Sequence, residues 1–166
     1  MFLLDSNVFI QAARLYYHPD IAPTFWRWLA EQHQQGALAS IVAVRKELDD
    51  GDKRQGPGHL KTWAASLPAS FWLKPDASTT PSMTQLSAWV MHPDRKYTQA
   101  AKDEFLRVAD YYLVAQAQSG QHHVVTFELP SPDSKKRVLI PDACNALGVP
   151  FAEPFSVYRD LGLRFL

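Results

Sequence analysis

Four acidic residues stand where carboxylates are costly, and they are the residues best suited to do chemistry. Asp5 and Glu128 each end a short, mostly apolar run. Glu47 and Asp110 lie in predicted helices, beside apolar residues. A carboxylate in such surroundings destabilises the fold unless it is paired or binds a cation. If the four converge, they cannot all ionise without a cation, and oxygen-only ligands favour Mg²⁺ or Mn²⁺.

The first ten residues are predicted to carry one of these acids to the edge of a sheet. Residues 2–4 are apolar at every position, which is typical of a parallel strand covered on both faces. Ser6 and Asn7 are good helix-capping residues and predict a helix from about Asn7 to Tyr17. Ligands of open α/β sheets bind outside the carboxyl ends of the strands, which is where Asp5 is expected. The alternative is that Asp5 serves only as a helix cap.

Further along the chain, strand and helix patterns alternate. Strands are predicted at 2–4, 37–41, 71–74, 122–128, 138–140 and 149–151. Helices are predicted at 7–17, 24–35, 42–49, 60–67, 81–91, 98–118, 141–148 and 154–161. This alternation predicts an α/β fold with a parallel sheet and right-handed crossovers. A length of 166 residues suits one domain.

Asp110 lies inside the longest predicted helix and has a structural alternative. Arg107 precedes it by three residues, so an ion pair within the helix would account for the acid. Asp103, seven residues earlier, shares the same predicted face and is expected to be paired or exposed. We favour metal binding for Asp110, because its neighbours are strongly apolar.

Composition limits the classes of function. Lys plus Arg and Asp plus Glu both number 17, so any attraction for a nucleic acid must be local. The basic clusters are Arg45-Lys46, Lys53-Arg54 with Lys61, and Lys135-Lys136-Arg137. A single cysteine, the absence of a membrane-length apolar run and the lack of a signal-peptide pattern predict a cytoplasmic protein without membrane association.

Four segments, in this order, resemble the PIN domain. They are Leu-Leu-Asp5-Ser-Asn7, Glu47 in an early helix, Ala-Asp110-Tyr-Tyr-Leu-Val-Ala, and Val-Val-Thr126-Phe-Glu128. PIN domains are small metal-dependent ribonucleases, and many bacterial ones are VapC-like toxins of toxin–antitoxin pairs. The resemblance covers about residues 1 to 150. It implies a three-layer α/β/α sandwich around a mostly parallel sheet, as a single PIN-like domain over residues 1–166.

The resemblance also implies roles for the acids. Asp5, Glu47 and Asp110 match three catalytic acids of the family, and Glu128 matches the fourth, which is usually Asp. Asp5, Asp110 and Glu128 would then bind Mg²⁺ or Mn²⁺.

Neighbouring residues complete the implied site. Ser6 or Asn7 matches a hydroxyl or amide that accompanies the first acid, and Thr126 precedes the fourth. Asp133 and Asp142 follow Glu128, and either could supply or replace the fourth acid.

The implied reaction is hydrolysis of RNA to a 5′ phosphate and a 3′ hydroxyl. The clusters Lys53-Arg54 and Lys135-Lys136-Arg137 could hold the RNA backbone. Trp63, Trp72 and Trp89 could stack on bases or pack in the core. An antitoxin and a second copy in a homodimer are the expected partners, with 71–90 as a possible docking segment.

Three other classes of protein compete with the PIN domain as interpretations of this sequence. A haloacid dehalogenase-type phosphatase needs Asp-x-Asp after the first strand, and Asn7 stands at the second position. A receiver domain needs an acid pair and a late lysine that cannot be placed. The non-enzymatic alternative is an interaction module, whose acids serve only as caps and surface charge.

Overall fold

The structure is a computed structural model that describes residues 1–51 and 58–165. Five short parallel strands form one sheet in the order β3-β2-β1-β4-β5. They are β1 (Phe2–Leu4), β2 (Leu38–Ile41), β3 (Trp72–Leu73), β4 (His123–Val125) and β5 (Phe151–Ala152). All four strand pairings are parallel, and β1 lies at the centre. The predicted α/β fold around a parallel sheet is therefore confirmed.

Nine α-helices are found in the described residues. They are α1 (Ser6–Gln11), α2 (Pro23–Gln34), α3 (Val42–Gly51), α4 (His59–Ser66), α5 (Thr79–Met91), α6 (Gln99–Phe105), α7 (Ala109–Ser119), α8 (Ile140–Leu147) and α9 (Pro154–Asp160). A π-helical segment, η1 (Ala12–Tyr16), continues α1, and a short 3₁₀ turn, η3 (Ala69–Phe71), precedes β3. None of the described helices is long and apolar enough to cross a membrane.

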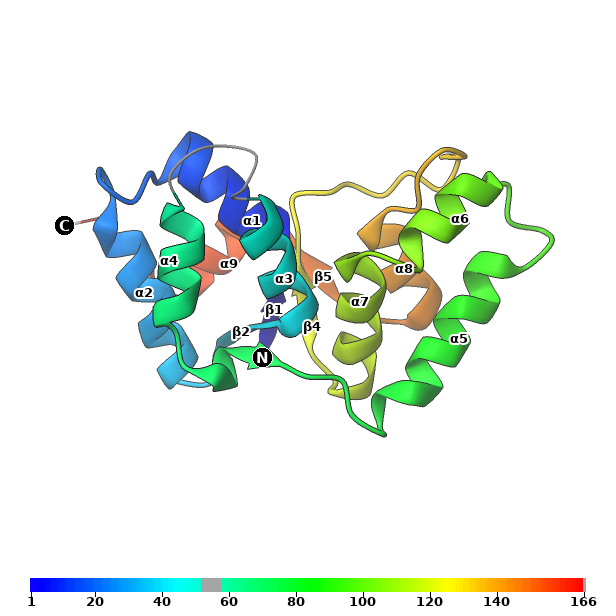
Figure 1. Ribbon diagram of the computed structural model, residues 1–166, viewed down its shortest axis with the longest axis horizontal. Helices are drawn as coiled ribbons and strands as arrows, with labels where there is room; N and C mark the ends of the chain where they lie inside the picture. Colours follow the sequence, from blue (N-terminus) through cyan, green and yellow to red (C-terminus); the bar gives the residue numbers. More distant parts are fainter. Residues whose placement is uncertain (52–57, 166) are drawn as a thin grey trace.

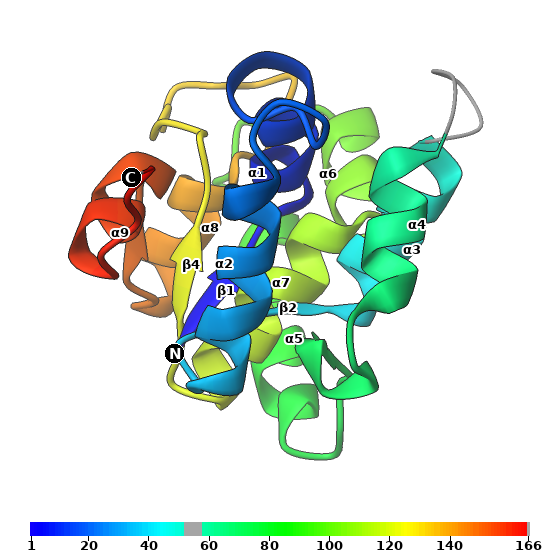
Figure 2. The same cartoon turned by 90° about the vertical axis from the view of Figure 1, so that its left-hand side faces the viewer.

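Helices cover both faces of the sheet. Figure 1 shows α2, α4 and α9 on one side and α5, α7 and α8 on the other. The strand order requires this arrangement. The chain leaves β1 and β2 towards one sheet edge and leaves β3 and β4 towards the other. Right-handed crossovers then put the two sets of helices on opposite faces. In Figure 2, α2 lies in front of β1.

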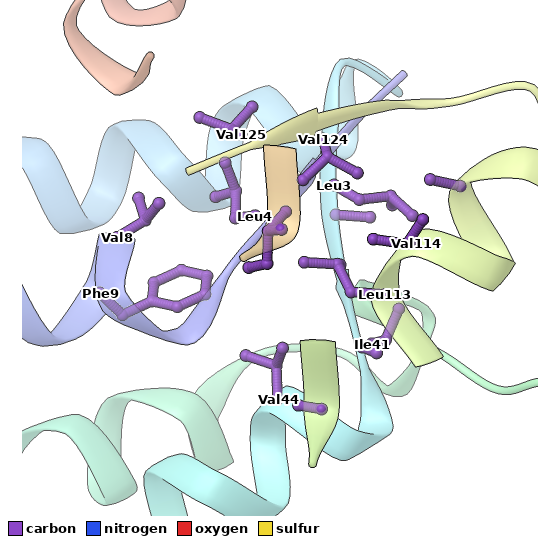
Figure 3. Packing of buried hydrophobic residues seen from close by; sticks show 14 of the residues in the cluster. Leu3, Leu4, Val8, Phe9, Ile41, Val44, Leu113, Val114, Val124 and Val125 are labelled. Atoms are coloured by element: carbon purple, nitrogen blue, oxygen red, sulfur yellow. The ribbon is translucent and has the colours of Figure 1, made fainter. Parts of the chain in front are cut away.

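The core explains why the central strands are apolar throughout. Leu3 and Leu4 of β1 and Val124 of β4 are fully buried. Figure 3 shows these side chains near Leu113 and Val114 of α7. Burial on both faces leaves no polar position within β1, so the first polar residue comes where the strand ends.

The predicted helix 98–118 is wrong in one respect that matters for the site. It is divided into α6 and α7, and Val108 between them is extended, with φ −97° and ψ 171°. The division puts Asp110 in the first turn of α7, where a carboxylate is favourable. Arg107 pairs with Glu104 rather than with Asp110, so the predicted structural alternative is also wrong.

Other predicted elements also differ in extent or type; the strands expected at 71–74 and 149–151, for example, are found at Trp72–Leu73 and Phe151–Ala152. The strand expected at 138–140 is absent, and Ile140 instead begins α8. The strand expected at 122–128 is shorter, because β4 ends at Val125. The first helix changes to π-helical geometry at Ala12. Its N-cap is Asp5, whose side chain makes no capping hydrogen bond.

Candidate functional site

The site begins where two neighbouring strands end at the same sheet edge. Leu4 is paired with Val125, so Asp5 and Thr126 leave β1 and β4 side by side. Thr126 Oγ1 donates a hydrogen bond to Asp5 Oδ2 at 3.1 Å, and Ser6 Oγ donates to Asp5 Oδ1 at 3.3 Å. The residue Asp5 is only 1% exposed. The hydroxyls hold its orientation but supply no positive charge.

The charges of Glu47 and Glu128 act on both Asp5 and Asp110. The pKa of Asp5 is raised to about 7, chiefly by burial and then by the negative charges of Glu128 and Glu47, while the hydrogen bond from Thr126 opposes the rise. Burial also raises the pKa of Asp110 well above its usual range. The charges of Asp5, Glu128 and Glu47 add to that rise, whereas Arg137 opposes it. Each aspartate therefore lies in a field of negative charge.

The two glutamates accept hydrogen bonds from backbone N–H groups at the starts of helices. Glu47 Oε1 accepts a hydrogen bond from the Ala109 N–H at 3.1 Å. Glu128 Oε2 accepts one from the Ile140 N–H at 2.8 Å, and Glu128 Oε1 pairs with Arg137. Ala109 and Ile140 are the first residues of α7 and α8. Both glutamates thus satisfy N–H groups at helix starts, where negative charge is stabilised.

A pocket of about 330 Å³, here called the acidic pocket, opens beside these residues. Its lining includes Asn7, Glu47, Asp110, Lys136 and Arg137. Carboxylates and cationic side chains therefore face the same space. An anion could reach Lys136 and Arg137 while a divalent cation lies among the acids.

The carboxylates of Asp5, Glu47, Asp110 and Glu128 are nevertheless farther apart than the ligands of a closed metal site. Within residues 1–51 and 58–165, one group brings three possible metal-ligand atoms within 4.8 Å of one another, namely His18, Asp20 and His59. All three of those residues are exposed, which gives no ground for assigning a metal to them. The four acids share an electrostatic field without meeting that distance.

A family model described as "Domain of unknown function (DUF4411)" matches residues 2–165. The chain belongs to the DUF4411 family. No curated protein and no solved structure matches it.

Three positions of the DUF4411 chain were candidates for the fourth acid. Glu128 is the one whose charge raises the pKa of both Asp5 and Asp110. Asp133 is exposed. Asp142 is buried, and its two oxygens accept the Ser131 N–H at 3.2 and 3.1 Å, which anchors the loop after β4. Among these three acids, Glu128 is therefore the one whose charge acts on both aspartates, whereas Asp142 has a structural partner.

The tryptophans and basic residues of the DUF4411 chain that could contact RNA differ in their surroundings. Trp72 is buried beneath the Arg45 guanidinium, and Trp63 packs against Trp26. Trp72 belongs to the core, and Trp63 is partly buried and packs against the core. Trp89 is partly buried and lies beside Arg95. The cluster Lys53-Arg54 lies outside the described residues.

Sequence patterns missed the contact between Arg137 and Glu128. Arg137 was recognisable only as part of a basic cluster suited to RNA. Nine residues separate the pair, so neither helical nor strand periodicity could indicate the contact. The helix-start roles of Glu47 and Glu128 were missed for the same reason.

Proposed function

We propose that this DUF4411 chain is a PIN-like, metal-dependent endoribonuclease that hydrolyses RNA phosphodiester bonds. The observation that carries the proposal is the pair of Asp5, where β1 ends, and Asp110, in the first turn of α7. Burial and neighbouring carboxylates raise the pKa of both. Perturbed carboxyl groups beside a pocket are typical of functional sites.

The donor set fits Mg²⁺ or Mn²⁺ in its chemistry. Asp5, Asp110 and Glu128 offer only oxygen atoms, which these hard cations prefer. A cation would also relieve the repulsion that raises the pKa of the aspartates. Bound there, it would act as a Lewis acid and lower the pKa of a coordinated water.

The protein groups around this centre have distinct parts in the proposed reaction. Thr126 and Ser6 hold the Asp5 carboxylate in one orientation. Glu47 is fixed through Oε1, which leaves Oε2 to accept a proton from the attacking water. Lys136 and Arg137 line the same pocket and are suited to hold phosphate groups on either side of the cleaved bond.

The decisive experiment is cleavage of RNA by purified protein with Mg²⁺ or Mn²⁺. Asp5→Asn and Asp110→Asn should reduce cleavage to background, as should EDTA. Asp103→Asn is the matched control, since Asp103 is exposed and bonded only to Gln99 among the described residues. Failure of the wild-type protein to cleave any RNA, or full cleavage by Asp5→Asn, would overturn the proposal.

A second candidate is a non-catalytic interaction module. The hydrogen bonds of Glu47 and Glu128 to helix starts favour it, because they give both acids a structural role. The two functions differ in their response to Mn²⁺. Saturation at about 100 times Kd would stabilise a metal enzyme by about 2.7 kcal/mol. The interaction module predicts no change in Tm.

The assignment as a toxin follows from the resemblance to the PIN domain. The same resemblance implies that the protein binds an antitoxin and forms a homodimer. Co-expression with the protein encoded beside it, followed by measurement of the mass of the complex, tests both partners together.

A further inference from the structure

A second pocket is also lined by Glu47. It has a volume of about 230 Å³ and is here called the arginine–histidine pocket. Glu47 of α3 lines both this pocket and the acidic pocket. The two pockets are therefore neighbours that share Glu47.

The lining has two chemically different parts. Ile10, Leu48 and Leu60 supply apolar surface. Arg14, His18 and His59 supply groups that can donate hydrogen bonds. Apolar walls with a few convergent polar groups are typical of sites for a flat, partly polar ring. The volume lies below the range of about 300 to 1,000 Å³ for drug-sized ligands, so it suits a single ring system.

Arg14 is the polar group most free to bind a ligand. It is exposed and makes no hydrogen bond or ion pair within the described part of the chain. An arginine is suited to such a site because its planar guanidinium can stack on a base or donate to its acceptors.

The backbone around Arg14 is also unusual. Arg14 and Ala13 belong to η1, the π-helical segment that follows α1. Departures of this kind within helices are frequent at functional sites, because the added residue redirects the side chains of one turn. Here the same turn contributes both Ala13 and Arg14 to the pocket.

We propose that the arginine–histidine pocket binds the nucleobase of the nucleotide next to the cleaved phosphodiester and thereby selects the cleavage sequence. The proposal rests on the ribonuclease function proposed above. The phosphate would lie in the acidic pocket, and the adjacent base would pass Glu47 to lie against Ile10, Leu48 and Leu60. Arg14, His18 and His59 would read its polar edge.

One test measures binding apart from cleavage. The Asp5→Asn protein, without metal, is titrated with AMP, CMP, GMP and UMP while the imidazole resonances of His18 and His59 are followed by NMR. One nucleotide should bind most tightly and move both resonances. Adding Arg14→Ala should weaken that binding about tenfold, as expected for loss of a charged hydrogen bond. Adding Arg27→Ala, an exposed arginine of α2 outside both pockets, should leave it unchanged.

A second test reads sequence preference. Wild type, Arg14→Ala, Ala13→Trp and Arg27→Ala cleave an RNA library with randomised positions. The tryptophan at position 13 should fill the pocket, and both pocket variants should lose the base preference at one position beside the cut. If Ala13→Trp fails to fold, Arg14→Ala decides the result.

The two proposals fail in different ways. Cleavage with a base preference that both pocket variants leave unchanged overturns the base pocket and leaves the ribonuclease standing. Absence of cleavage by wild type overturns the ribonuclease. Mononucleotides that leave the resonances of His18 and His59 unmoved overturn the base pocket whatever the cleavage result.

Discussion

The acids of the candidate site occupy two regions that the fold treats differently. At the sheet edge, the hydroxyls of Thr126 and Ser6 donate hydrogen bonds to Asp5, yet burial and neighbouring carboxylates still raise its pKa to about 7. At the helix starts, Glu47 and Glu128 accept backbone N–H groups, and Glu128 also pairs with Arg137. The aspartates should therefore destabilise the protein without a cation, whereas the glutamates should stabilise it. Groups that cost stability beside a pocket point to a ligand.

The largest expected effect is that of Asp5→Asn. It should abolish cleavage and the Mn²⁺-induced rise in Tm, yet stabilise the metal-free protein at neutral pH. The stabilisation follows because the amide removes a buried negative charge, while its oxygen can accept from Thr126 and its NH2 group can donate to the Ser6 hydroxyl. Chemical denaturation of both proteins in EDTA measures it. A less stable Asp5→Asn protein would remove the distinction between aspartates and glutamates.

The pH dependence of stability sharpens the same distinction. A pKa raised from 3.8 to about 7 means that the folded state holds the Asp5 proton more tightly than the unfolded state does. The stability contributed by the protonated carboxyl is thus complete below pH 3.8 and is lost as pH rises towards about 7. The full loss is on the order of 4 kcal/mol for such a shift.

The measurement is the difference between wild type and Asp5→Asn across that window, both without metal. Asp5→Asn should become the more stable of the two as pH rises. A difference that stays constant with pH would show that folding leaves the pKa of Asp5 unchanged.

The glutamates should behave in the opposite way. Glu128→Ala removes the acceptor of the Ile140 N–H and the partner of Arg137, so it should destabilise the metal-free protein by about 1–3 kcal/mol. Glu104→Ala is the control, since Glu104 forms an exposed pair with Arg107 and should change stability by at most about 1 kcal/mol. Urea unfolding of the two variants measures these changes in the free energy of unfolding. If both variants lose equally little stability, Glu128 does not stabilise the metal-free protein, and the distinction between the glutamates and the aspartates is wrong.

The part of this site that could be predicted from sequence follows from local patterns. The apolar run before Asp5 predicts the end of a buried strand, and Thr126 follows a similar run, so parallel pairing brings them together. The break before Asp110 could not be predicted. Apolar spacing continues through 98–118 without Gly or Pro, and the interruption involves Glu47, which is 62 residues away from Ala109. The strand expected at 138–140 failed similarly, because Glu128 satisfies the N–H with which Ile140 begins α8.

Thr126 joins the two regions, and its replacement has the smallest expected effect. Its hydroxyl donates to Asp5 Oδ2 and accepts the Glu128 N–H, both at 3.1 Å. Thr126→Val keeps the shape but removes both bonds. Because the bond to Thr126 lowers the pKa of Asp5, its loss should raise that pKa and weaken Mn²⁺ binding about tenfold. Thr126→Ser should restore the affinity, which separates the hydroxyl from the packing of the side chain. Calorimetric titration with Mn²⁺ measures all three proteins, and equal affinities would mean that Asp5 is oriented without Thr126.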